Sequence, residues 1–207
     1  KVKIPKSAHR TMSFLTKEEM HKVYEYYKRT QDPFVGLFLF SYLAGGMNLA
    51  DVMRLKWNQH YFDTDQKEFI YKRVKTEKKN DFFIRVAISD VMREIIGDEQ
   101  PVFDEYVFPY LRGTKTPQEL RLALTNACHR VNTHLKKMCR KLKFDKEVTP
   151  TFARHSYSTI LRRESVPGDF VEYSMGHSMK GSAGNYFGGY TTEQMLEFNS
   201  KLLKLTA

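Results

Sequence analysis

The sequence predicts a mainly α-helical fold with one small antiparallel β-hairpin. Over most of the chain, apolar residues recur at intervals of three and four, which is the period of an amphipathic helix. The alternation typical of strands is confined to two short runs and predicts two or three short strands. A length of 207 residues is enough for one domain with a single sizeable core.

The composition is that of a soluble globular protein with excess positive charge. The chain has 34 Lys and Arg against 24 Asp and Glu, a net charge of +10. Such an excess favours a polyanionic partner, most often nucleic acid, although many basic proteins bind no anion. The sequence has no membrane-spanning apolar stretch, no secretory signal, and no CxxC or HExxH pattern. We therefore expect a cytoplasmic, nucleoid-associated bacterial protein that uses no metal.

The N-terminal part predicts a linker followed by two helices. Residues 1–13 are basic, contain a proline and lack periodicity, which is typical of a linker that arrives from an upstream segment. Thr16 and Glu19 form a capping-box pattern that opens a helix to about Arg29. The apolar run at residues 33–45 is too short to cross a membrane and predicts a buried helix at the centre of the core.

A glycine turn and a hairpin follow this helix. Gly45 and Gly46 end it, and the stretch NLADVMRLKW begins a new helix with Asn48 as the N-cap. The runs KEFIYKRVKT and DFFIRVAIS are rich in β-forming residues and are joined by a polar tip. This pattern predicts a β-hairpin.

A long amphipathic helix is predicted from Gln118 to Leu142. Both cysteines, Cys128 and Cys139, lie in it about 16 Å apart along its axis, beyond disulfide reach. The other face of the helix is basic, either because it is solvated and suits the helix C-terminus or because it lies against DNA phosphates. The candidate DNA-binding residues are Arg121, Arg130, Lys136, Lys137, Arg140 and Lys141.

Three more helices are predicted towards the C-terminus. The first begins after Pro150, and a shorter one is entered through Pro167 and Gly168. The last runs from Thr192 to Leu205 and has an apolar stripe. This stripe suits docking on a neighbouring protomer, and it suits packing on its own domain equally well.

The chain offers the groups that a phosphodiester reaction needs. Such a reaction requires a nucleophile, cations or donors around the phosphorus, and an acid for the leaving oxygen. Lys75, Arg154 with His155, His177 and Tyr186 appear in this order. An arginine suits the phosphate oxygens because its planar fork donates two bonds and keeps its charge. Taken singly, a tyrosine or a histidine of this kind is more often a packing or helix-end residue.

The order and spacing of these residues resemble the catalytic domain of the tyrosine recombinases, the phage and transposon integrases. Lys75 stands in an R-x-K-T setting, and Arg154 stands in ARHS. His177 follows 23 residues later in MGHS, and Tyr186 comes nine residues after that. The resemblance extends from Phe14 onward and implies the tyrosine recombinase catalytic fold over residues 14–207. It also implies that residues 1–13 lead from a missing core-binding domain.

The resemblance implies a role for each matching residue. Tyr186 corresponds to the nucleophile that forms a 3′-phosphotyrosyl bond and releases a 5′-hydroxyl. Arg154 corresponds to the second arginine of the family's site, which clamps the nonbridging oxygens. His177 corresponds to the histidine that hydrogen-bonds the phosphate, and Lys75 to the general acid at the leaving oxygen. Tyr190 is the rival nucleophile, farther from His177.

Two positions depart from the family pattern. Asn48 stands where the first arginine is expected, and Thr151 stands where the histidine of H-x-x-R is expected. We group His155 with them as a supporting position. An asparagine or threonine donates a hydrogen bond but brings no charge, which weakens stabilisation of the transition state unless another cation substitutes. Arg54 and Arg73 are close in sequence and are candidates for this substitution.

The resemblance implies a site-specific recombinase that cleaves and rejoins duplex DNA with no cofactor, metal or ATP, integrating or excising a mobile element. Its partners would be duplex DNA and other protomers in a synaptic tetramer, with a monomer expected for the isolated domain. A recombinase-derived DNA-binding protein that no longer cuts is one alternative. A type IB topoisomerase-like enzyme and an unrelated basic helical module are others. The short interval from MGHS to Tyr186 favours the integrase over the topoisomerase.

Overall fold

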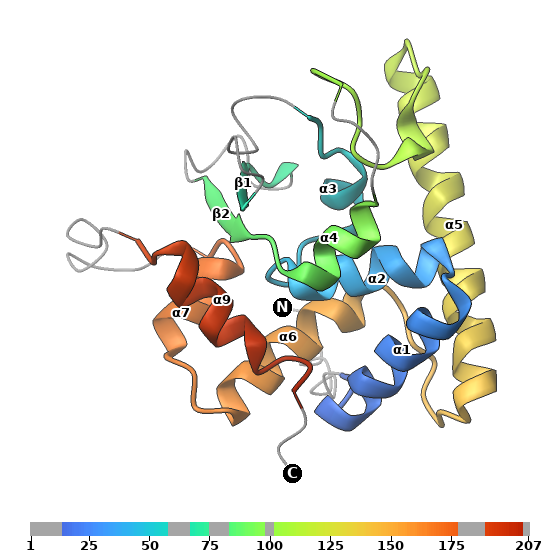
Figure 1. The fold of residues 1–207 in the computed structure, drawn as a ribbon. Coiled ribbons are helices and arrows are strands. Elements are labelled where there is room, and N and C mark those ends of the chain that lie inside the picture. The colour runs from blue at the N-terminus through green and yellow to red at the C-terminus, as the bar shows by residue number, and fades with distance from the viewer. Residues whose placement is uncertain (1–13, 58–66, 75–82, 98–101, 178–188, 205–207) are drawn as a thin grey trace, which may run out of the picture.

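The computed structural model describes residues 14–57, 67–74, 83–97, 102–177 and 189–204. Within these ranges, helices surround a central helix and a two-stranded sheet lies to one side (Figure 1). The predicted fold class, mainly α with a small antiparallel hairpin, is confirmed. The elements in chain order are α1 (Lys17–Thr30), α2 (Pro33–Leu43), α3 (Leu49–Met53), β1 (Glu68–Tyr71), β2 (Ile84–Ala87), α4 (Asp90–Ile96), η2 (Pro109–Leu111), α5 (Pro117–Leu142), α6 (Thr151–Arg163), α7 (Gly168–Ser174) and α9 (Thr192–Ser200).

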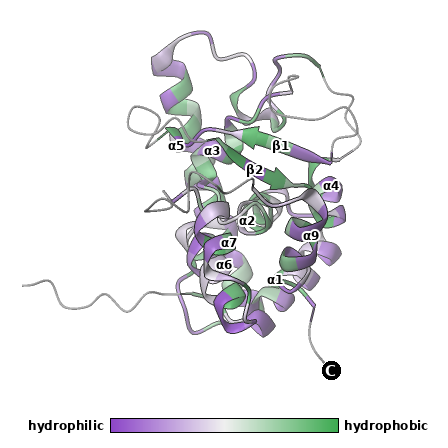
Figure 2. Ribbon diagram, turned by 90° about the vertical axis from the view of Figure 1, so that its left-hand side faces the viewer, coloured by the Kyte–Doolittle hydropathy of each residue, from purple (hydrophilic) through white to green (hydrophobic). Residues whose placement is uncertain are grey.

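Helix α2 forms the centre of the core, as the sequence predicts. Every residue from Phe34 to Leu43 is buried, and α2 packs against α1, α3, α4, α5 and α6. Figure 2 shows it in the interior, between the surrounding helices. The helix begins sharply because Asp32 caps it and Pro33 occupies its first position, where a missing N–H costs nothing. The Asp32 carboxylate accepts hydrogen bonds from the backbone N–H groups of Phe34 and Val35.

Capping boxes fix the starts of three helices. At α1 the Thr16 side chain accepts a hydrogen bond from the Glu19 backbone at 3.2 Å, and the Glu19 carboxylate accepts one from the Thr16 backbone at 2.7 Å. The same reciprocal pattern opens α5 at Thr116 and α9 at Thr191. These bonds satisfy backbone donors that have no partner inside the helix.

The predicted hairpin is present as β1 and β2. The two strands are antiparallel, and Phe69 lies opposite Val86 in their register. Both of these residues are buried, while Glu68 and Arg85 form a bidentate ion pair on the more exposed side. Helix α4, which the sequence analysis does not predict, follows directly and is capped by Ser89. The strand-like pattern of DFFIRVAIS runs into this cap and conceals the short helix that begins there.

Helix α9 packs on its own domain. It contacts β2, and the Tyr157 hydroxyl in α6 donates a hydrogen bond to the Asn199 side chain at 3.2 Å. Just beyond α9, the buried Tyr42 hydroxyl in α2 donates to the Leu202 carbonyl at 3.0 Å. Of the two uses that the sequence left open for the apolar stripe, the structure therefore shows packing within the chain.

Two further features concern membranes and metals. Among the described residues, no helix combines the length and apolar character needed to cross a bilayer. In the same ranges, no three His, Cys, Asp or Glu side chains gather into a group that could hold a metal ion. Cys128 and Cys139 are both free thiols, as their separation along α5 predicts.

Replacing Ser156 with Ala is expected to destabilise the domain, because the hydroxyl of this fully buried serine accepts a hydrogen bond from the Leu15 backbone at 2.9 Å. Loss of the acceptor leaves a buried N–H unpaired and should lower the free energy of unfolding by about 1–3 kcal/mol. Urea denaturation measures the change. The control is Thr125→Ala on the exposed side of α5, with an expected effect within about 0.5 kcal/mol. Equal effects in the two variants would contradict the prediction.

Candidate active site

Arg154 lies in the first turns of α6, where two loops converge on its guanidinium group. One nitrogen donates to the Gly46 carbonyl at 3.1 Å, and the other donates to the Met175 carbonyl at 2.7 Å. The second nitrogen also lies 2.9 Å from Nε2 of His177. The structure thus brings together Arg154 and His177, two residues that the sequence predicts for one site.

Two glycines make this convergence possible. Gly46 has a φ of +65°, and a Cβ at this position would lie 2.6 Å from the Cα of Arg154. Gly176 also has a φ of +65°, and a Cβ there would lie 2.2 Å from Ile84 and 3.2 Å from the Cδ of Arg73. Only glycine combines this backbone conformation with so close an approach. The glycines of the GGMN and MGHS motifs therefore bring α6, the end of α7 and the hairpin into contact.

Glu172 orients the His177 ring. Its carboxylate lies 2.5 Å from Nδ1 of His177, and its other oxygen pairs with Arg162. The backbone N–H of His177 donates to the Glu172 carbonyl at 3.0 Å. With the Nδ1 proton directed at Glu172, Nε2 carries the lone pair that accepts from Arg154. The side chain of His177 is 45% exposed, so the imidazole lies at the surface of the described part of the structure.

Arg73 and Tyr71 bring two further donors to the same region. Tyr71 is the last residue of β1 and is 4% exposed, and Arg73 follows it by two positions beside Gly176. Within the described part of the chain, neither the Tyr71 hydroxyl nor the buried Nε of Arg73 has a hydrogen-bond partner. Burial lowers the pKa of Arg154, and the positive charge of Arg73 lowers it further. Two arginine charges therefore lie close together in the site.

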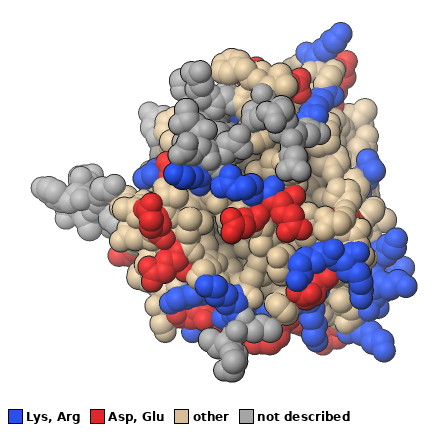
Figure 3. All heavy atoms as spheres, in the orientation of Figure 1, with Lys and Arg blue, Asp and Glu red and all other residues tan. Residues whose placement is uncertain are grey.

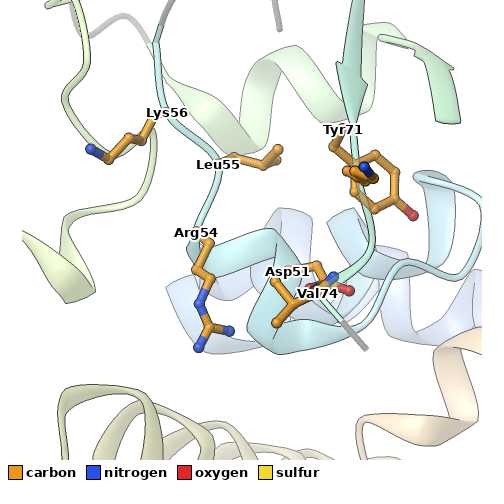
Figure 4. Close-up of a pocket in the computed structure, with 7 residues that line it drawn as sticks. Asp51, Arg54, Leu55, Lys56, Tyr71 and Val74 are labelled. Atoms are coloured by element: carbon orange, nitrogen blue, oxygen red, sulfur yellow. Dashed lines mark hydrogen bonds between the residues drawn. The ribbon is translucent and has the colours of Figure 1, made fainter. Parts of the chain in front are cut away.

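Asp51 in α3 is a buried carboxylate beside these cations. It is 5% exposed, and it accepts hydrogen bonds from the Val74 backbone and the Asn48 side chain, both at 3.4 Å. Burial raises the pKa of Asp51, against these hydrogen bonds and the charges of Arg73 and Arg54. Figure 4 shows Asp51 in a pocket that Arg54 also lines. The bond to Val74 holds the end of the hairpin strand against α3.

The departing positions Asn48 and Thr151 are engaged elsewhere. The Asn48 side chain donates to Asp51, and the Thr151 hydroxyl pairs with that of Thr149 at 2.8 Å. Both residues line a groove beside Arg154, together with the partly buried His155. Neither side chain adds positive charge to this groove.

The six basic residues predicted to bind DNA on α5 do not form one face. At about 100° per residue, Arg121 lies in line with Cys128 and Asn132, which line the groove beside Arg154. A second group, Arg130, Lys137 and Lys141, lies about half a turn away, and Lys136 and Arg140 lie between the two groups. The guanidinium carbon of Arg130 lies 4.4 Å from the centroid of the Phe34 ring. Figure 3 shows Lys and Arg side chains gathered over α1 and the C-terminal half of α5.

Two predicted catalytic residues, Lys75 and Tyr186, lie outside the described residues. The rival nucleophile Tyr190 is described and is packed in an aromatic cluster. Its ring centroid lies 5.0 Å from that of Phe170 and 5.6 Å from that of Tyr173. This environment is that of a packing residue.

The sequence of the chain places it in a known family. A family profile described as "Phage integrase family" matches residues 13–192. The chain belongs to the phage integrase family. The predicted resemblance to tyrosine recombinases is therefore confirmed.

One solved structure shares the phage integrase fold with this chain. It is the integrase of transposon Tn1549 in complex with transposon right end DNA. The TM-score is 0.57 at 13% sequence identity, and the alignment covers 97% of this chain and 69% of that one. At this identity the likeness establishes the fold alone. No curated protein sequence shows significant similarity to the chain.

Three residues that the structure places around Arg154 and His177 are absent from the sequence prediction. Glu172 stands five positions before His177, a spacing that brings the two together only because the chain turns at Gly176. Asp51 is the single charged residue of α3, which is a usable sequence signal for a buried functional carboxylate. Tyr71 gave no signal, because a tyrosine in a strand is ordinarily a packing residue.

Replacing Asp51 with Asn should change the pH dependence of the free energy of unfolding. Because the folded-state pKa of Asp51 is raised, its stabilising contribution is full below its unfolded pKa of about 4 and is lost as pH rises through the folded pKa. The asparagine does not titrate. The free energy of unfolding of the variant minus that of the wild type should therefore increase from about pH 4 to neutral pH.

Urea denaturation at both pH values measures this difference. The control is Glu147→Gln, because a hydrogen bond from Lys136 lowers the pKa of the exposed Glu147 carboxylate. The control difference should change with pH in the opposite direction. A pH-independent difference for Asp51→Asn would contradict a raised pKa at this position.

Proposed function

We propose that the chain is a tyrosine recombinase that cleaves and rejoins duplex DNA to integrate or excise a mobile element. The phenol oxygen of Tyr186 attacks the phosphorus and gives up its proton to water as the bond forms. The bond to the 5′ oxygen breaks, and Lys75 supplies the proton that this oxygen takes. The 3′-phosphotyrosyl link conserves the bond energy, so that attack by a 5′-hydroxyl on this link rejoins the strand without ATP.

The arrangement of Arg154 and His177 carries this proposal. The Arg154 fork is fixed by two backbone carbonyls, and one of its N–H groups points at Nε2 of His177. A phosphate oxygen that takes the place of this contact would accept a hydrogen bond from Arg154, and from Nε2 of His177 once that nitrogen carries a proton. Donors fixed before the substrate arrives stabilise charge in the transition state most effectively.

Arg73 is the candidate for the cation that Asn48 does not supply. It adjoins Arg154 closely enough to lower the pKa of that residue, and its buried Nε has no partner among the described residues. Arg54, by contrast, folds back and donates to the Ala50 carbonyl of its own helix at 3.2 Å. We therefore assign the missing positive charge to Arg73.

The substrate of this reaction is duplex DNA, and recombination requires a synaptic tetramer of protomers. The net charge of +10 suits a polyanion, and the related Tn1549 integrase was solved with its transposon end DNA. On α5, Arg121 lies on the same face of the helix as Cys128 and Asn132, which line the groove beside Arg154. Of the six basic residues, we therefore expect Arg121 to contact the duplex that is cleaved. Arg130, Lys137 and Lys141 point away from that face, so we assign them no contact with the cleaved step.

A covalent-trapping assay should identify the nucleophile. The protein is incubated with a nicked suicide duplex that carries the candidate attachment site from the DNA flanking its gene. A denaturing gel then reveals any covalent adduct. Wild type and Tyr190→Phe should both form the adduct, because the ring of Tyr190 is held in the aromatic cluster. Tyr186→Phe should form none.

Each other result has a definite meaning. An adduct that persists in Tyr186→Phe and disappears in Tyr190→Phe would transfer the nucleophile to Tyr190. If no variant forms an adduct although the duplex is bound, the chain is a DNA-binding protein that does not cut. Relaxation of supercoiled plasmid without strand exchange would instead indicate the topoisomerase activity.

Arg73→Ala should slow adduct formation by about 100-fold or more, the usual cost of removing one preorganised donor at a developing charge. Arg73→Lys should retain part of the rate, because a lysine keeps the charge and loses the planar fork. Arg54→Ala serves as the matched control and should change the rate by no more than about 3-fold, since Arg54 bonds its own helix. Single-turnover kinetics on the suicide duplex measure all three. A larger loss for Arg54→Ala than for Arg73→Ala would assign the role to Arg54.

A further inference from the structure

The buried hydroxyl of Tyr71 has no hydrogen-bond partner among the residues that the structure describes. Tyr71 is 4% exposed, and its hydroxyl makes no hydrogen bond with any described residue. A buried O–H without an acceptor carries a desolvation cost that no hydrogen bond to a described residue offsets. Native proteins pair nearly all of their buried polar groups, and an exception of this kind points to a ligand or a functional role.

The direction and the surroundings of the Tyr71 hydroxyl limit which ligands it could bind. Figure 4 shows the ring at one side of a pocket that Arg54 and Lys56 also line, with the hydroxyl oxygen directed away from both of them. Burial raises the pKa of Tyr71 and Asp51 raises it further, while the charges of Arg154 and Arg73 act in the opposite direction. The hydroxyl therefore stays protonated at neutral pH, so it can donate a hydrogen bond while carrying no charge.

None of the described residues accepts a hydrogen bond from this donor. Asp51 is the nearby carboxylate, but its hydrogen bonds come from Val74 and Asn48. The buried Nε of Arg73 is a second donor with no described acceptor. Two unpartnered donors beside the Arg154 guanidinium match an oxyanion, because such a ligand has several acceptor oxygens and carries negative charge.

We propose that the Tyr71 hydroxyl donates a hydrogen bond to a nonbridging oxygen of the phosphodiester that Arg154 holds, which makes Tyr71 a further catalytic residue. This inference rests on the proposed function. In this role Tyr71 supplies a donor on the hairpin side of the phosphate, and Arg154 and His177 supply donors from α6 and the end of α7. The burial of Tyr71 fixes its hydroxyl before the duplex binds, as an oxyanion-binding donor requires.

Tyr71→Phe provides the first test, because it removes one oxygen atom and keeps the ring that packs against Phe69. The free variant should unfold at the same urea concentration as wild type or a higher one, since the lost hydroxyl has no partner there. Adduct formation on the suicide duplex should slow by roughly 10- to 100-fold. The matched control is Tyr26→Phe, a buried tyrosine of α1 far along the chain from the site, which should leave the rate unchanged.

A modified substrate separates a direct contact from a structural effect. In a methylphosphonate duplex, one nonbridging oxygen of the scissile phosphate is replaced by a methyl group, and the two stereoisomers remove different oxygens. If Tyr71 donates to one of these oxygens, the deficit of Tyr71→Phe should disappear on the isomer that lacks that oxygen and persist on the other. Equal deficits on all three substrates, or no deficit on phosphate, would overturn the proposal.

Failure of the proposed function can be recognised separately. If the wild-type chain forms no adduct on any duplex, the recombinase proposal fails, and equilibrium binding of the same three duplexes then decides on Tyr71. A wild-type preference for phosphate over one methylphosphonate isomer that is lost in Tyr71→Phe would support the contact. The same preference in both proteins, or none in either, would overturn it.

Discussion

The arrangement of the site depends on one constraint, the close approach of the Gly46 loop to the Arg154 backbone. Gly46 has no Cβ, so the loop after α2 can lie directly on α6 at Arg154. The Gly46 carbonyl then accepts a hydrogen bond from one arm of the Arg154 guanidinium. The Met175 carbonyl at the end of α7 fixes the other arm. These two bonds hold the loop that leads into α3 and the residue two positions before His177 against Arg154. The helices around α2 supply the rigid frame that holds both loops in place.

Most of the fold could be predicted from local chemistry. Thr16 with Glu19 defines the start of α1, since a capping box satisfies the same donors in any context. Helix α2 was predictable because a short run that is apolar on all sides fits only a core. The pairing of Arg154 with His177 came from the resemblance to the integrases, and no periodicity alone would have placed them together. Local sequence patterns therefore predict the individual helices and strands, and the order of the integrase motifs predicted that Arg154 and His177 lie in one site.

The rest of the site required tertiary information. Glu172 faces His177 because the chain reverses at Gly176, a conformation that a one-dimensional pattern does not contain. Helical geometry alone sets Arg121 about half a turn from Arg130 on α5. Which of the two lies toward the groove beside Arg154 became clear only from the α5 residues that line it, Cys128 and Asn132. The position of the Tyr71 hydroxyl could not be predicted from the sequence either. Strand alternation predicts that the ring is buried, but it does not predict the hydrogen-bond partners of the hydroxyl.

The electrostatics of the site favour a phosphate over other ligands. Arg73 and Arg154 are partly buried like charges, and the described carboxylates nearest to them, Asp51 and Glu172, are already bonded to other groups. This arrangement costs folding stability in the DNA-free chain, because repulsion and unpaired donors remain in a region of reduced dielectric. An oxyanion relieves both at once, whereas a neutral ligand would relieve only the unpaired donors. In the proposed reaction, the fold orders these groups before the phosphate arrives, so little binding energy would be used to position them and more would be available to stabilise the transition state.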